Sequence, residues 1–191
     1  AGQETAAIGL TWALYLLALD PEVQERAASE ARAALGGRAA GAADTPALGY
    51  VRQVVEETLR LYPPAGFMTR TALEDDELAG RTVRAGATVI LPIYALHRHE
   101  ALWERPQAFD PDRFAPAAAG ERHRYQHLPF GAGPKVCIGY ALAMMEAEII
   151  LATLLARFEV SLPEGFRSEP RMWFTLRPHG GMPLTIRRRA A

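Results

Sequence analysis

The 191-residue sequence has one cysteine, one lysine and almost no excess of charge of either sign. A single cysteine excludes an internal disulfide. The net charge of −1 and the pI of about 6.6 give no indication of a nucleic-acid partner. Two pairs of histidines, His97 with His99 and His123 with His127, lack the glutamate and the third-ligand spacing of zinc motifs. This spacing argues against a zinc site.

The sequence also lacks a long apolar run and an initial methionine. Its apolar stretch at 8–19 is too short for a membrane-spanning helix, and no basic segment or cleavage site marks a signal peptide. We therefore interpret residues 1–19 as a buried helix and expect no transmembrane segment in this chain. Because the sequence begins inside a helical pattern, we expect it to be the C-terminal part of a longer protein.

The remaining pattern predicts a helix-rich α+β fold with small sheets. Asp20 followed by Pro21 is typical of a helix start, and Gly36 and Gly37 end that helix. Three prolines make the region 103–127 irregular. Further helices are expected at 45–62, 93–99 and 140–158, and short strands at 67–71, 82–83, 88–91 and 160–187.

Cys137 is the most informative residue because of its surroundings. It lies in the glycine-rich segment 130–139, directly before an apolar helical stretch. The N–H groups at a helix N-terminus stabilise a thiolate, and glycines let a flat group approach the backbone. A lone cysteine is more often a small buried apolar residue. This context instead favours a metal ligand, and haem iron is the best candidate.

Three further segments are weak indicators when each is taken alone. The E-x-x-R pair of Glu57 and Arg60 has two other copies, at 121–124 and 164–167, but only this copy lies on a clear helix before two prolines. The segment 109–114, FDPDRF, is a turn with aromatic anchors. The segment 1–5, AGQET, is the polar end of a helix.

Together, and in this order, the four segments resemble those of cytochrome P-450, the haem-thiolate monooxygenases. The family pattern F-x-x-G-x-R-x-C-x-G matches residues 130–139 with Lys135 in place of arginine, and F-x-P-E-R-F matches 109–114 with Asp112 in place of glutamate. The resemblance covers nearly the whole chain. It implies the C-terminal haem-binding part of a single cytochrome P-450 domain over 1–191, with the distal helix at 1–19, the cysteine loop and proximal helix at 128–158, and the N-terminal part absent.

The resemblance also implies a role for individual residues. Cys137 corresponds to the axial ligand of the haem iron, and Thr5 and Glu4 to the pair that delivers protons to bound dioxygen. Glu57, Arg60 and Arg113 correspond to a buried ion network behind the haem loop. The other implied haem-binding positions are Lys135, Arg70, Phe130, Gly131, Gly139, Ala143 and Ala1. The implied substrate-lining positions are Phe67, Met68, Phe174 and Thr175.

The implied activity is insertion of one oxygen atom from dioxygen into a small apolar substrate. The implied cofactor is haem b, with electrons from NAD(P)H through a ferredoxin- or flavin-type partner. A basic surface at Lys135, Arg122 and Arg124 is expected to bind an acidic partner. Two alternatives stay open: a peroxide-driven peroxygenase of the same fold, and a haem-free structural or interaction unit. The alanine- and arginine-rich composition favours a soluble, cytoplasmic bacterial enzyme.

Overall fold

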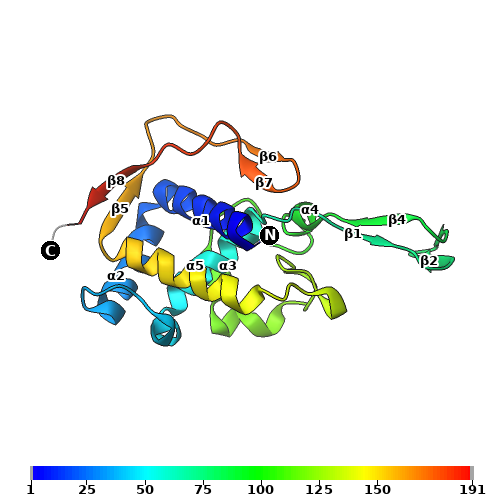
Figure 1. Ribbon diagram of the computed structural model, residues 1–191, viewed down its shortest axis with the longest axis horizontal. Helices are drawn as coiled ribbons and strands as arrows, with labels where there is room; N and C mark the ends of the chain where they lie inside the picture. Colours follow the sequence, from blue (N-terminus) through cyan, green and yellow to red (C-terminus); the bar gives the residue numbers. More distant parts are fainter. Residues whose placement is uncertain (1, 190–191) are drawn as a thin grey trace.

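The longer helices lie together at the centre of the molecule (Figure 1). The computed structural model describes residues 2–189, apart from the side chains of Ala119 and Glu121. The apolar faces of the helices meet in one core, where Leu17, Val54 and Leu151 are fully buried. The mainly helical α+β fold predicted from the sequence is therefore confirmed. The four helices are α1 (Gly2–Leu19), α2 (Pro21–Leu35), α3 (Gly49–Leu61) and α5 (Tyr140–Leu155).

The ends of α2 follow the expected capping chemistry. The Asp20 carboxylate accepts a hydrogen bond from the backbone N–H of Val23 at 3.0 Å, and Pro21 occupies the first turn. At the other end, Gly36 adopts a left-handed conformation with φ of 56°. Both helix limits were predicted from these residues.

The start of α3 differs from the prediction. The sequence predicts one helix from residue 45, but residues 42–47 form a separate 3-10 helix, η1 (Ala42–Ala47), and α3 begins at Gly49. The cause is a distant side chain, because Glu30 of α2 accepts hydrogen bonds from the N–H groups of Tyr50 at 2.8 Å and Val51 at 2.9 Å. Its carboxylate satisfies the exposed donors at the helix N-terminus.

Within residues 2–189, the strands form four two-stranded antiparallel sheets. In the first two, β1 (Met68–Thr71) pairs with β4 (Thr88–Leu91), and β2 (Asp76–Leu78) pairs with β3 (Arg81–Val83). These strands make an arm that projects from the helices (Figure 1). In the other two, β5 (Phe158–Ser161) pairs with β8 (Thr185–Arg188), and β6 (Pro170–Met172) pairs with β7 (Leu176–Pro178). The strand β2 was not predicted, because two of its three residues, Asp76 and Glu77, are acidic residues that are uncommon in strands.

Short helices fill the irregular region and the cysteine loop. They are α4 (Ile93–Leu96), η2 (Pro111–Phe114), η3 (Pro116–Glu121) and η4 (Gly133–Lys135). Helix α4 ends earlier than the predicted residue 99. Helix α5 ends at Leu155 and not at the predicted residue 158, where β5 begins. Within residues 2–189, no single helix is both long and apolar enough to cross a membrane. Helices α1 and α2 meet those criteria only as a pair, bent by 115°.

Candidate functional site

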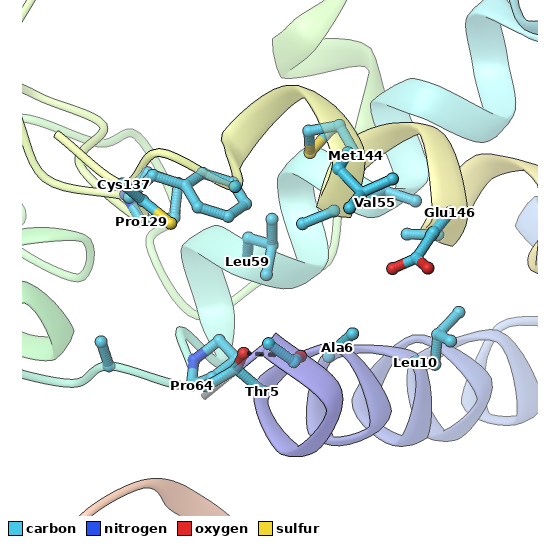
Figure 2. A pocket seen from close by; sticks show the side chains of 18 of the residues that line it. Thr5, Ala6, Leu10, Val55, Leu59, Pro64, Pro129, Cys137, Met144 and Glu146 are labelled. Carbon is cyan, nitrogen blue, oxygen red and sulfur yellow. Dashed lines mark hydrogen bonds between the residues drawn. The ribbon is translucent and has the colours of Figure 1, made fainter.

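A cavity of about 250 Å³ separates α1 from the cysteine loop and the start of α5. Figure 2 shows Thr5 and Leu10 of α1 on one side and Cys137 and Met144 on the other, with Leu59 of α3 between them. Most of the lining side chains are apolar, and Glu146 is the charged one among them. This lining suits a group that is largely apolar.

Cys137 lies in the wall of this cavity, one turn before α5. Its side chain is exposed. Its backbone N–H donates to the carbonyl of Phe130 at 3.0 Å, and its own carbonyl accepts from the N–H of Tyr140 at 3.2 Å. The loop therefore closes on itself and fixes the sulfur beside the N-terminus of a helix, where a thiolate is stabilised.

The backbone conformation of the loop requires glycine at two positions. Gly131 has φ of 74° and Gly133 has φ of 70°, which are left-handed values that other residues rarely adopt. Gly139 is different, since its φ is −85°. A Cβ built at Gly139 would lie 3.8 Å from the Cys137 sulfur, an ordinary contact. Glycine at 139 thus leaves one side of the sulfur uncovered.

The residues present fit a haem with a thiolate ligand. The thiol of Cys137 opens into an apolar cavity, and Phe130 and Ala143 also line that cavity. Within residues 2–189, Lys135 makes no ion pair, and Arg70 donates to the carbonyl of its neighbour Thr69 at 2.8 Å. Both cations are exposed and outside the cavity lining, where they are available to carboxylates of a bound group. Gly131 and Gly139 belong to the loop, and Ala1 lies outside the described residues.

The two residues of the predicted proton-delivery pair lie on different sides of α1. Thr5 lines the cavity, and its hydroxyl donates to the carbonyl of Gly2 at 3.1 Å. Glu4 does not line the cavity. Its carboxylate accepts hydrogen bonds from the Thr175 hydroxyl at 3.0 Å and from the Arg177 guanidinium. The bond from Thr175, followed by that from Arg177, holds the pKa of Glu4 below its ordinary value.

Glu57 and Arg60 form a fully buried ion pair behind the cysteine loop. Two guanidinium nitrogens of Arg60 donate to the two carboxylate oxygens of Glu57, at 2.6 and 2.8 Å, and both side chains are 0% exposed. Arg113 lies 3.4 Å from the same carboxylate, and the N–H of Asp110 donates to it at 2.9 Å. The structure thus brings the three predicted network residues together. Asp112 is elsewhere, in an exposed pair with Arg26 at 2.8 Å.

His97 connects this network to the cysteine loop, a role that its sequence position does not reveal. Its carbonyl accepts a hydrogen bond from Arg60 at 2.8 Å, and its Nε2 accepts from the N–H of Leu128 at 2.8 Å. Burial lowers the pKa of His97 to about 4, so the imidazole stays neutral and can accept. The second histidine of this region, His127, packs 5.1 Å from it between ring centroids.

Only some of the residues expected to line the substrate site or to bind a partner lie where they were expected. Met68 lines the cavity, whereas Phe67 and Phe174 are exposed outside it and Thr175 is buried against Glu4. Arg122 does not belong to an open basic surface. Its guanidinium lies 4.3 Å from the ring centroid of Phe114 and donates to the backbone carbonyl of Arg113. These two contacts hold the side chain against the protein. Lys135 and Arg124 remain exposed.

Comparison with known proteins identifies the family. The family model for cytochrome P450 matches residues 1–183. This chain belongs to the cytochrome P-450 family. It is 43% identical to cyclooctatin synthase of Streptomyces melanosporofaciens, with 92% of this chain and 38% of that protein covered. It is 39% identical to a cytokinin hydroxylase of Arabidopsis thaliana, with 98% of this chain and 36% of that protein covered.

A solved cytochrome P-450 haem domain has the same fold. Its crystal structure superimposes with a TM-score of 0.92 at 33% identity, covering 100% of this chain and 42% of that one. The chain therefore spans little more than a third of the curated relatives that it matches. Relatives at similar identity come from plants and from humans as well as from bacteria, so the expectation of a bacterial origin is not supported.

Proposed function

We propose that the full-length protein is a haem-thiolate monooxygenase and that this chain supplies its iron ligand and part of its distal wall. The observation that carries the proposal is the position of Cys137, exposed at one wall of an apolar cavity whose opposite wall holds Thr5. Membership of the cytochrome P-450 family, whose members carry haem, supports it. When bound, the haem would supply the redox chemistry that activates dioxygen.

The residues of this site would then have the following roles. Cys137 would bind the iron as a thiolate, which the adjacent helix N-terminus stabilises. Lys135 and Arg70 would hold the haem carboxylates. Thr5 would place its hydroxyl on the distal side, where it would serve proton delivery, and the apolar lining would exclude water from the cavity.

The substrate and the electron donor belong to the same proposal. A small apolar substrate fits the apolar lining, to which Met68 contributes. Electrons would come from NAD(P)H through a ferredoxin- or flavin-type partner. Exposed Lys135 and Arg124 would form the basic contact with that partner, without Arg122. The haem-binding domain would extend beyond this chain, because the relatives are more than twice its length.

The source of the inserted oxygen tests this function. The full-length protein, supplied with a reductase and an apolar substrate under ¹⁸O₂, is expected to give product with one labelled oxygen. Efficient turnover with unlabelled hydrogen peroxide and no reductase would instead indicate a peroxygenase. A full-length protein that binds no haem would overturn both.

Removing the distal hydroxyl tests its role within that reaction. In Thr5→Ala, we expect several-fold less product per NAD(P)H consumed, because the hydroxyl proposed for proton delivery is lost from the cavity wall. Thr11→Ala is the matched control. Thr11 lies on the same helix and donates to the carbonyl of Ala7 at 2.8 Å, but it does not line the cavity. Equal losses in the two variants would contradict a distal role for Thr5.

A further inference from the structure

A second pocket, of about 240 Å³, adjoins the Cys137 cavity, which is the cavity of about 250 Å³ described above. Leu59, Phe130 and Met144 line both spaces and so form the partition between them. Tyr140, the first residue of α5, lines only the second pocket. The second pocket therefore lies between α3, the cysteine loop and the start of α5, and it is distinct from the proposed haem site.

His127 supplies the feature of this pocket that points to a ligand. It is one of the lining residues, and its Nε2 is buried without a hydrogen-bond partner in the part of the chain that the structure describes. Buried polar atoms of folded proteins nearly always have such a partner. Burial, the largest influence, holds the pKa of His127 well below its ordinary value, so the imidazole is neutral. Nε2 is thus available for a hydrogen bond with a neutral group.

The charges around the pocket also favour a neutral ligand. Glu56 is the acidic residue of the lining, and its carboxylate already lies 3.2 Å from the guanidinium of Arg52, one turn earlier on α3. Burial raises the pKa of Glu56, and the attraction of Arg52 opposes this shift. An additional ion would lose its hydration without gaining a free partner of opposite charge.

The size and the walls of the pocket define the ligand further. Its volume exceeds the roughly 30 Å³ of one water molecule but lies below the range of about 300–1,000 Å³ that is common for drug-sized ligands. The rings of Phe130 and Tyr140 meet edge to face, with centroids 4.9 Å apart, and both line the pocket. Val136 and Tyr140 are 50% and 41% exposed, so the pocket can be reached from the surface. These walls suit one small aromatic molecule.

From these observations we infer that this pocket binds a small neutral aromatic alcohol, whose hydroxyl bonds to Nε2 of His127 and whose ring packs against Phe130 and Tyr140. A hydroxyl group can donate or accept, so it suits either tautomer of the imidazole. The carbonyl of Phe130 accepts from the N–H of Cys137 at 3.0 Å, so the ligand would contact the segment that positions the sulfur. The inference goes beyond the proposed function and does not depend on it.

The first test compares two ligands and two variants of the full-length protein. Phenol is the probe, and toluene, which has no hydroxyl, is the control ligand; NMR titration gives both affinities. We expect His127→Phe to weaken phenol binding about tenfold, because the buried hydroxyl loses its partner, and to leave toluene binding unchanged. His123→Phe is the matched control, because His123 is exposed and does not line the pocket.

Two results of this titration would overturn the inference. Equal phenol affinity in wild type and His127→Phe would show that phenol binds elsewhere, for example in the Cys137 cavity, which His127 does not line. Equal weakening of phenol and toluene in His127→Phe would show that the substitution disturbs packing and that no hydrogen bond to Nε2 is lost.

The second test is a crystal structure of the wild-type full-length protein soaked with phenol. It requires no variant, so it decides the question even if His127→Phe does not fold. We expect the phenol oxygen within hydrogen-bond distance of Nε2 of His127. Phenol absent from this pocket, or the pocket filled by another segment of the full-length protein, would overturn the inference. Absence of monooxygenase turnover would reject the proposed function without affecting either measurement.

Discussion

Two carboxylate–arginine clusters flank the cavity, and they differ most in burial. Glu57 and Arg60 are completely buried, whereas Glu4 and Arg177 are each about half exposed. The buried pair receives further bonds from backbone groups of the irregular region, so no partner can leave without exposing an unpaired charge to the interior. The first cluster is thus fixed by the fold, while the second lies at the surface, where the loss of one partner leaves no unpaired charge in the interior.

The largest expected effect comes from breaking the buried cluster. Arg60→Ala leaves the Glu57 carboxylate without its main partner, which costs about 3–5 kcal/mol. We expect the full-length protein to lose haem content and cooperative unfolding, as measured by pyridine haemochrome assay and denaturant titration. Arg167→Ala is the control, because Arg167 belongs to an exposed E-x-x-R copy. Normal haem content in Arg60→Ala would contradict the role of this cluster.

The next effect concerns His97, which joins the buried cluster to the cysteine loop. Its pKa is about 4 in the fold against an ordinary 6.5. Below pH 6.5, His97 binds a proton in the unfolded chain, but in the folded chain it does so only near pH 4. The free energy of unfolding therefore decreases as the pH falls from 6.5 to 4. The expected slope from this group is about 1.4 kcal/mol per pH unit.

Denaturant titrations at several pH values measure this contribution. His97→Gln keeps an acceptor for the N–H of Leu128 but does not titrate, so its stability should vary less between pH 6.5 and 4 than that of wild type. His99→Gln, at an exposed position, is the control. Identical pH dependence in wild type and His97→Gln would show that His97 is not held neutral by burial.

A smaller effect is expected on the exposed side of the site. Lys135→Met removes the cation proposed for a haem carboxylate, which corresponds to about 1.5–3 kcal/mol and a roughly tenfold or greater loss of haem affinity. Haem transfer to apomyoglobin measures this loss. Lys135→Arg should retain the affinity, since arginine supplies the same charge. Equal haem affinity for Lys135→Met and wild type would remove Lys135 from the site.

The smallest effect is expected at Asp112, although it adjoins Arg113 of the buried cluster. Its carboxylate pairs with Arg26, and both side chains are 55% exposed. Asp112→Asn should therefore change the free energy of unfolding by no more than about 1 kcal/mol. A loss as large as that of Arg60→Ala would show that burial does not separate the two classes of charged residues.

Local chemistry made much of the fold predictable from the sequence. Asp20 and Gly36 fix the limits of α2 through interactions within a few residues, so their pattern could be recognised. The buried ion network was predictable from the family resemblance. The pairing of Glu57 with Arg60 also follows from their spacing, since residues three apart on a helix lie side by side. The start of α3 was not predictable in this way, because its capping group, Glu30, belongs to another helix.

The same distinction applies to the site. The position of Cys137 follows from its own loop, but the direction of Glu4 depends on Thr175 and Arg177, which only the tertiary fold brings near. Arg122 was expected at an open surface, yet its partner ring, Phe114, comes from an irregular segment with no periodic pattern. Pairings between distant segments thus account for the parts of the site that the sequence did not reveal.

The most direct test of the central claim is the absorption spectrum of the full-length protein, reduced under carbon monoxide, beside a Cys137→Ser variant. If Cys137 is the iron ligand, the wild-type protein should show the strongly red-shifted Soret band of thiolate-ligated haem, and the variant should lack it while still folding. The same red-shifted band in Cys137→Ser, or a wild-type protein that binds haem without it, would contradict the account.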